Sequence, residues 1–388
     1  MHGIKVNLLT TGTRAIMGVA TAVIGLVATA TDADAEAFPL DTPVLVTDVR
    51  AAIGKAGVAG TLSPSLVAIA DQCSPIVIVV RVAEGVDGDD PDTDAVLETQ
   101  ANVIGGVAGG KYTGIQALLA AEAQTGIRPR IIGAPGLDTQ DVTVALVTAA
   151  QKLRGFAYAS CRAADGLALA GDVAEAILYP AEFSAKELML IYPDFTGFAG
   201  HAVAAAMGLR ARIDEEVGWH KTLSNVGVNG VSGLTKDIFF DLQDASNDAG
   251  VLNAANVTTL VRMNGYRFWG NRTCSDEPLF AFESAVRTGQ ALQDSIAAGL
   301  AWAVDKPLTP QLVRDIEETI NADFRQLIRE GRMIGGKAWF DPSLNPAVNL
   351  SAGKCVVDYD YTPCAPLEDL ELNQRITSKY YSDFGSQI

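Results

Sequence analysis

Short apolar runs rich in β-branched residues alternate with amphipathic stretches along most of the chain. Residues 15–30 predict two buried strands bent at a glycine. From residue 42 onward the runs predict strands at 44–49, 75–82, 130–134, 156–160 and 187–192. Helical spacing predicts helices between them, at 63–71, 113–124 and 139–154. The repeated strand, helix, strand order predicts an α/β domain with a largely parallel sheet.

Residues 15–30 also have a second interpretation, as a signal peptide. Lys5 and Arg14 precede the apolar run, and residues 28–30 (Ala-Thr-Ala) resemble a cleavage site. However, the run is rich in Thr, Gly and β-branched residues and is short for a membrane span. We favour strands, and cleavage after Ala30 is the open alternative.

The pattern changes after residue 251, where longer elements follow one another. Residues 252–269 read as loop and strand, and helices are expected at 284–304 and 310–329. Thr309 is a good N-cap, Pro310 suits the first helical position, and Gly331 suits the C-terminal glycine. The second helix has one apolar face, formed by Leu312, Ile316, Ile320, Phe324 and Leu327. Charged residues lie largely off that face: Arg314, Asp315, Glu317, Glu318, Arg325 and Arg329. This charged face either meets water or docks on a partner.

Both ends of the chain read as extended strands. Ile4, Val6 and Leu8 alternate with other residues near the N-terminus. Strand-like runs at 354–361 and 370–376 follow the helices, and the second carries Leu370, Leu372 and Ile376 on one face. Such ends fray in a monomer but can add to the sheet edge of a neighbour in a polymer.

Composition narrows the class of protein. A chain of 388 residues suits two domains, or one large domain with an insertion. Hydrophobic residues make up 48% and charged residues only 19%, which favours an assembling protein with much buried surface. The net charge of −17 argues against nucleic acid and membrane partners. Five scattered cysteines without a C-x-x-C pair are expected to be reduced and mostly buried.

No motif predicts an active site, a metal site or a cofactor. The Gly-x-Ser-Gly of residues 230–233 lacks the frame of a nucleophile elbow, and His220 has no predictable acid or base partner. The glycine-rich residues 104–110 match neither a dinucleotide nor a phosphate-binding motif. The acidic residues 84–94 form a solvated loop that lacks the complete calcium-binding pattern. We therefore expect no catalytic residue, no metal and no cofactor.

Several long strings carry a resemblance to a known family. They lie at 38–40, 135–139, 216–231, 265–276, 302–307 and 358–363. In this order they closely resemble the tail sheath proteins of temperate enterobacterial myophages, from about Gly3 to Tyr380.

The resemblance implies a structural subunit that polymerises around a tail tube and contracts. It implies an α+β subunit overall: an N-terminal arm (1–19), an inserted outer α/β domain (20–251) resembling a non-catalytic subtilisin-like fold, an inner domain (252–368) and a C-terminal arm (369–388). The arms would pair with a neighbour's sheet, and the helix at 310–329 would touch the tube. The implied partners are further copies, the tube protein, and baseplate and tail terminator proteins. The implied location is the virion tail, after assembly in the host cytoplasm.

Two other classes remain open from the residues alone. A secreted α/β hydrolase-like protein would be cleaved after Ala30 and would lose activity with His220 or Ser232. A soluble ligand-binding protein would stay monomeric. Neither class explains two strand-like termini.

Overall fold

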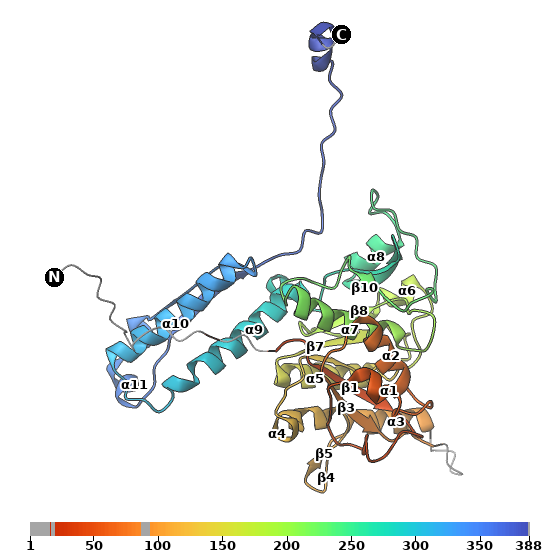
Figure 1. Cartoon of the computed structure of the whole chain (residues 1–388), viewed down its shortest axis with the longest axis horizontal. Coiled ribbons are helices and arrows are strands. Elements are labelled where there is room, and N and C mark those ends of the chain that lie inside the picture. Colours follow the sequence, from red (N-terminus) through yellow and green to blue (C-terminus); the bar gives the residue numbers. More distant parts are fainter. Residues whose placement is uncertain (1–15, 17–19, 87–93, 387–388) are drawn as a thin grey trace, which may run out of the picture.

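The structure, a computed structural model, describes residues 16, 20–86 and 94–386. Figure 1 shows three parts, which we name by residues. The body (20–282) is a large α/β unit. The distal module (283–363) projects from it along helix α9, and the C-terminal arm (364–386) runs away from both.

One nine-stranded sheet forms the centre of the body. Its order is β2-β3-β1-β6-β7-β8-β10-β11-β9, in which β3, β1, β6, β7, β8 and β10 pair in parallel. The strands on the two edges pair antiparallel. The bounds are β1 (Ile24–Thr29), β2 (Val44–Val46), β3 (Val77–Val82), β6 (Ile131–Gly133), β7 (Phe156–Ser160), β8 (Leu188–Ile191), β9 (Gly227–Val228), β10 (Val257–Arg262) and β11 (Tyr266–Trp269).

The predicted strands are found, with one correction. β7 spans the predicted residues, and β2, β3, β6 and β8 lie inside the predicted ranges. We predicted two strands bent at a glycine over residues 15–30. Of these the structure describes 16 and 20–30, and residues 20–30 hold one strand, β1. Gly25 lies inside that strand and does not bend it. A Cβ at this position would come 2.9 Å from Pro129 Cβ, so the glycine lets the two segments pack closely.

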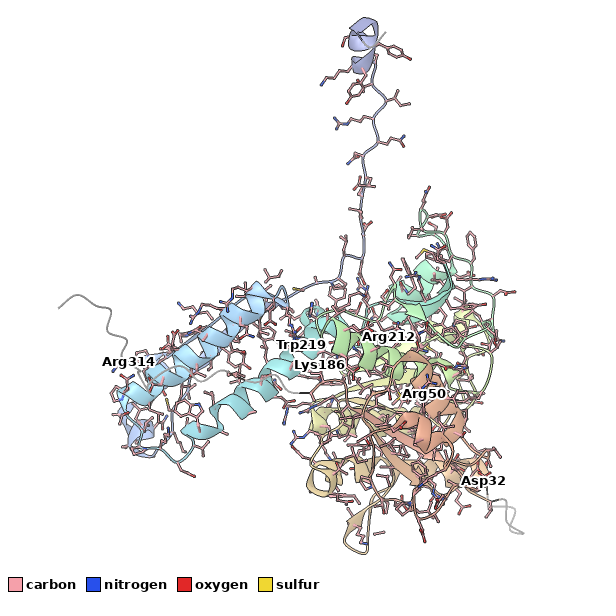
Figure 2. All side chains as sticks on the ribbon, in the orientation of Figure 1. Asp32, Arg50, Lys186, Arg212, Trp219 and Arg314 are labelled. Atoms are coloured by element: carbon pink, nitrogen blue, oxygen red, sulfur yellow. The ribbon has the colours of Figure 1, made fainter. Side chains whose placement is uncertain are left out.

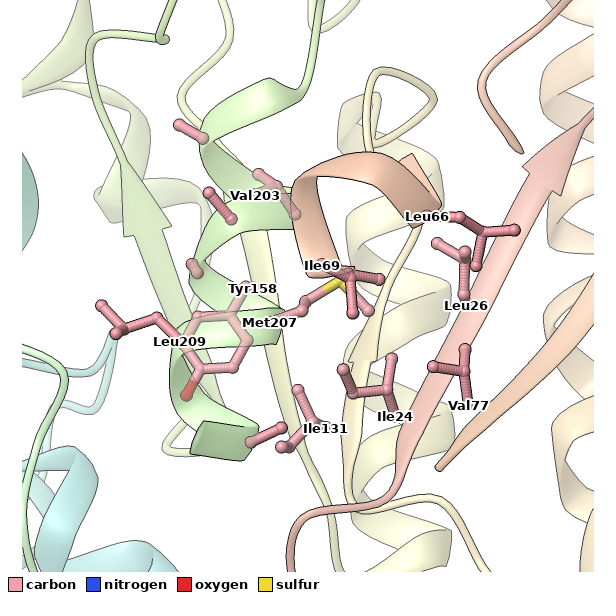
Figure 3. Packing of buried hydrophobic residues seen from close by; sticks show 14 of the residues in the cluster. Ile24, Leu26, Leu66, Ile69, Val77, Ile131, Tyr158, Val203, Met207 and Leu209 are labelled. Carbon is pink, nitrogen blue, oxygen red and sulfur yellow. The ribbon is translucent and has the colours of Figure 1, made fainter. Parts of the chain in front are cut away.

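Helices cover both faces of the sheet because its central strands are apolar on both sides. Along β1, Ile24, Leu26 and Ala28 face one core, and Val27 faces the other. Figure 3 shows the first core, where Leu66 and Ile69 of α2 and Met207 of α7 pack on the strands. The helices on this side are α1 (Val49–Ile53), α2 (Leu62–Gln72) and α7 (His201–Glu216).

The opposite core is covered by shorter elements and one long helix. They are α3 (Ala95–Ile104), η1 (Gly114–Ala120), α4 (Ala121–Thr125), α5 (Gln140–Leu153), α6 (Val173–Ala176), η2 (Tyr179–Glu182) and α8 (Asp248–Ala254). α5 confirms the helix predicted at 139–154. The helix predicted at 113–124 begins instead as a 3₁₀ segment, η1, before one α-helical turn, α4.

The sheet does not end where we predicted the outer domain to end. β10 and β11 lie beyond residue 251, yet both are strands of the nine-stranded sheet. The predicted boundary at 251/252 followed a change in local pattern. Strand pairing instead keeps residues up to 269 within the body.

The distal module has its own small core. It consists of α9 (Glu283–Leu300), η4 (Ala301–Ala303), α10 (Pro310–Arg329), α11 (Ala347–Ser351) and an antiparallel pair, β12 (Met333–Trp339) and β13 (Asp358–Pro363). Both predicted helices are confirmed, and the Thr309 hydroxyl accepts from Leu312 N as an N-cap. The strand predicted at 354–361 begins only at Asp358. The core residues are Ala291, Leu292, Ile296, Ile320, Phe324, Leu327, Met333 and Ala338, together with Trp219 of the body.

The remaining short elements connect these parts. They are the hairpin β4 (Val107–Ala108) and β5 (Lys111–Tyr112), and the 3₁₀ segments η3 (Pro278–Phe280), η5 (Pro342–Leu344) and η6 (Lys379–Ser386). In the described part of the chain, no helix combines the length and apolarity that crossing a bilayer requires.

Candidate functional site

The C-terminal arm leaves the molecule without folding back on it. Residues 364–378 have no helix or strand, and Figure 1 shows them extending away from the body and the distal module. The predicted arm residues Leu370, Leu372 and Ile376 are 66%, 80% and 100% exposed. Three apolar side chains are thus held in water on a segment with unpaired backbone, which is costly unless a partner covers them. The other predicted arm residues, Ile4, Val6 and Leu8, lie outside the described residues.

The base of the arm is tied to the body. Arg272 Nη2 pairs with Glu368 Oε2 at 2.8 Å, and Asn271 Nδ2 donates to Glu368 Oε1 at 3.4 Å. These contacts lie at one wall of a cavity of about 790 Å³, between residues 217–225, residues 240–254 and the arm. Glu368 therefore marks the point at which the arm separates from its own subunit.

The β12–β13 pair is a sheet of two strands with open edges. Among the described residues each strand has one partner, the other strand, and the register runs from Trp339↔Asp358 to Met333↔Pro363. Ile334 on β12 is 67% exposed. Because an isolated two-stranded sheet is marginally stable and leaves ladder hydrogen bonds unmade, this pair is suited to accept further strands.

Five of the six predicted charged residues of α10 are exposed, and the sixth, Glu317, is partly buried. Arg314, Asp315, Glu318, Arg325 and Arg329 are exposed, and Figure 2 shows Arg314 near the end of the module that is distant from the body. Arg325 pairs with Glu318, and Gln311 bridges Arg314 and Asp315. Exposed pairs of this kind contribute little stability, so these side chains are available to a partner surface.

The other side of the module meets the body through a stripe that the sequence analysis did not predict. Glu283, Arg287, Gln290 and Asp294 lie at i, i+4, i+7 and i+11 of α9, on one face of the helix. Glu283, Arg287 and Asp294 are only 0%, 3% and 7% exposed. We call these four residues and their body partners the α9 ladder.

Each residue of the α9 ladder bonds to the body. Glu283 accepts from Tyr158 and pairs with Arg210 at 3.4 Å. Arg287 pairs with Asp214, which Arg210 also contacts at 2.7 Å. Gln290 Nε2 donates to Gly155 O at 2.7 Å. Asp294 pairs with both Arg130 and Arg154.

The charges of the α9 ladder are strongly coupled. Burial alone would lower the pKa of Arg210, but Asp214 and Glu283 outweigh it and raise that pKa. Burial lowers the pKa of Arg130 to about 10, although Asp294 opposes the shift. Burial, together with Glu283, raises the pKa of the Tyr158 hydroxyl well above its ordinary value, so it stays a donor.

The histidines and Ser232 do not form a catalytic group in the described residues. His201 stacks on Phe198 and its Nδ1 lies 3.2 Å from Thr196 O. Burial, with Arg332 as a second cause, lowers the pKa of His220. Ser232 Oγ lies 3.2 Å from the Thr196 hydroxyl.

At the carboxyl edge of the sheet, where α/β folds commonly bind ligands, the buried carboxylates Asp138 and Asp194 are used in internal bonds. Asp138 is fully buried, pairs with Arg162 and accepts from Ser160 N. Asp194 accepts from the backbone N–H groups of Gly200 and Ala202 at the start of α7, and from that of its neighbour Phe195. The glycine-rich residues 104–110 end in the β4–β5 hairpin turn and not in a phosphate loop. Over the same described ranges, no cluster of His, Cys, Asp and Glu could hold a metal ion.

The cysteines are less buried than predicted. All five are free, and Cys161 and Cys274 are buried. Cys73, Cys355 and Cys364 are partly exposed.

Family models cover most of the chain. Residues 110–274 match the phage tail sheath protein central domain, and residues 275–377 match the phage tail sheath C-terminal domain. Residues 21–82 match the tail sheath protein Gp18 domain III N-terminal region. The chain is 50% identical to the tail sheath protein of Escherichia phage P2, covering 100% of this chain and 98% of that protein. This chain belongs to the phage tail sheath family.

A second relative of this sheath family member is similar over nearly the whole chain. The major tail sheath protein of Serratia phage KSP20 is 48% identical, covering 98% of this chain and 96% of that protein. The central-domain model ends at residue 274 and the C-terminal-domain model begins at residue 275. This division lies beyond the last strand of the nine-stranded sheet, whereas we predicted a boundary at 251/252. Both named relatives are tail sheath proteins.

Solved structures show the same fold at low identity. The PVC sheath complex of an extracellular contractile injection system, in its contracted state, matches with a TM-score of 0.70 at 15% identity, covering 98% of each chain. The helical sheath of the anti-feeding prophage in its contracted state matches with a TM-score of 0.69 at 16% identity, covering 97% of this chain and 98% of that one. The fold class, α/β with an attached α+β module, is thus confirmed, and the subtilisin-like detail stays a prediction.

Proposed function

We propose that the chain polymerises into a helical sheath around a tail tube and is held there in an extended, metastable state. On release at a baseplate the sheath contracts and drives the tube through the host envelope. The observation that carries this proposal is an exposed apolar arm on a subunit that also presents a two-stranded sheet with open edges. Membership of a family of tail sheath proteins supports it.

Donated arms would connect the subunits. In this proposal, residues 370–376 of one copy add to the β12–β13 sheet of a neighbour, where ladder hydrogen bonds supply affinity and Leu370, Leu372 and Ile376 supply register. The N-terminal arm, with Ile4, Val6 and Leu8, would use a second open edge. Such an interface is heterologous, because donor and acceptor are different surfaces, and it therefore propagates into a helix.

The position of Ile16 supports the assignment of the N-terminal arm to the distal module. A Cβ at Gly299 of α9 would lie 2.6 Å from Ile16 Cγ1, so Ile16 packs closely against α9. We place the inner layer of the sheath at the distal module and the two arms, and the outer layer at the body. The exposed face of α10 would then meet the tube. Charge reversal at Arg314 or Arg325 that left tube-templated assembly unchanged would contradict this contact.

Contraction needs no catalysis in this proposal. Each subunit has a lower-energy packing against its neighbours, which a barrier separates from the extended state. The arms stay paired while the subunits rotate, so the lattice shortens and widens without coming apart. An extended tail that contracted only with ATP would contradict the proposal. We further propose the virion tail as its location, assembly in the host cytoplasm, and contacts with baseplate and terminator proteins.

Electron microscopy of the purified chain tests the assembly step. The full chain is compared with versions that lack residues 1–14 or residues 369–388, with and without the tube protein. We expect regular tubes from the full chain and only small particles from both truncations. Tubes formed by both truncated chains would rule out assembly through donated arms.

A further inference from the structure

Module and body meet along α9 through polar groups. Ala291, Leu292 and Ile296 of α9 face the module's own core, whereas Glu283, Arg287 and Asp294 face the body and are buried there. Buried charges are rarely used where apolar packing would suffice, because each must be fully paired to offset the loss of water. The α9 ladder therefore fixes a geometry more than it adds stability.

The two ends of the ladder are built as bridges. Near the start of α9, Asp214 of the body joins Arg287 of the module to Arg210 of the body. Farther along, Asp294 of the module joins Arg130 and Arg154 of the body, and Gln290 bonds to Gly155 O between them. Tilting α9 away from the body would break one bridge and leave a buried charge without its partner.

The order of signs along α9 also opposes sliding. Packed helices can change register by one turn when their contacts permit it. A one-turn slide would bring Arg287 to the position of Glu283, opposite Arg210, and would place two cations together in a buried site. Both rotation and translation of the module are therefore penalised.

Trp219 adds an apolar contact at the same joint. It extends from the loop after α7 into the core of the distal module, is 6% exposed, and has Arg332 of the module over its ring at 5.0 Å from the centroid. Figure 2 shows Trp219 where the module meets the body. The joint thus has the hydrogen bonds and ion pairs of the α9 ladder on one side of α9 and the packed indole ring of Trp219 on the other.

We propose that the α9 ladder locks the distal module to the body at one angle, so that the two turn as a single lever while the sheath rearranges. Glu283, Arg287 and Asp294 are positioning residues in this inference, and the bending is confined to the arms. The inference rests on the proposed function for its consequence in the sheath. The lock itself is a property of the single chain.

Hydrogen exchange of the purified full chain tests the lock without any sheath. The variant D294N removes the charge that joins Arg130 and Arg154, and R154Q removes only the partner that is 39% exposed. The control E318Q breaks the exposed pair with Arg325 on α10. We expect exchange in residues 283–300 to rise about tenfold or more in D294N and by less in R154Q, with β1 and β7 unchanged.

The outcomes separate the lock from general damage. Exchange in D294N and R154Q that matches E318Q overturns the lock. If D294N also raises exchange in β1 and β7, the variant has disturbed the body as a whole. The result for R154Q then decides whether the lock exists, because R154Q leaves the Arg130–Asp294 pair intact. An effect of R154Q confined to α9 supports the lock, and no effect on α9 overturns it.

Electron microscopy of assembled sheaths tests the lever. D294N keeps both arms, so we expect sheaths to form, with body density smeared relative to the module layer and incomplete shortening on contraction. Full contraction of D294N with the wild-type angle between body and module would overturn the lever. A wild-type chain that forms no sheath would instead refute the proposed function, and the exchange result would still decide the lock.

Discussion

Replacing Leu372 by serine is a direct way to measure what the C-terminal arm contributes to assembly. Leu372 is 80% exposed in the single chain, so nearly the whole side chain is available to be buried by a neighbour. Full burial of a leucine stabilises by about 1.5–3 kcal/mol, and four fifths of that is about 1–2.5 kcal/mol. At 1.36 kcal/mol for each factor of ten, L372S should raise the critical concentration for assembly about 5- to 70-fold.

The neighbouring residue supplies a matched control. Glu371 is also exposed, but it lies on the opposite face of an extended strand. Pelleting of polymer over a concentration series gives the critical concentration of the wild type, L372S and E371S. We expect E371S to stay within about twofold of the wild type, because a solvated charge loses little when the strand pairs. An equal shift in both variants, or none in L372S, would refute the assignment of an apolar face to this arm.

Three further predictions concern the distal module, each measured by urea unfolding of the dilute chain. F324A should lower the free energy of unfolding of the module by about 3–5 kcal/mol, because Phe324 is fully buried in its core, and a loss below about 1 kcal/mol would contradict that packing. T309A should cost about 1 kcal/mol through the lost cap on Leu312 N, whereas T309S should be near neutral. Burial, with Glu330 as a second cause, raises the pKa of Asp323 to about 6, so ionising this carboxyl disfavours the folded state and its contribution falls as the pH rises from about 4 through 6. Because the side chain is partly exposed, we expect D323N to gain about 1 kcal/mol at pH 7.5 and nothing at pH 4, and an equal gain at both pH values would refute the assignment.

The strands were the most predictable part of the fold. A parallel sheet covered on both faces favours apolar residues on both sides of its strands, so β7 appears in the sequence as a largely apolar run at 156–160 that ends in Ser160. The two long helices of the distal module were also predictable. α10 carries one apolar face and has both of its end signals, Thr309 and Gly331, in place.

Other elements could not be predicted from local pattern. α7 was missed because it is rich in alanine and buried all round, from Ala202 to Ala206, so it has no polar face to give a period. The extent of the sheet beyond residue 251 could not be predicted, because the pairing of β10 with β8 is a contact between segments distant in sequence.

The α9 ladder was missed although its signal was present. Glu283, Arg287, Gln290 and Asp294 recur at helical spacing, but polar residues at this spacing normally face water. Only the positions of Asp214, Arg130 and Arg154, which lie far away in the sequence, show that this stripe is buried.

The most direct test of the account is a high-resolution structure of the polymer formed by the purified chain. The account predicts that residues 370–376 of one copy form a strand hydrogen-bonded to the β12–β13 sheet of another, with Leu370, Leu372 and Ile376 covered. A polymer in which these residues fold back on their own subunit, or remain unpaired, would contradict it.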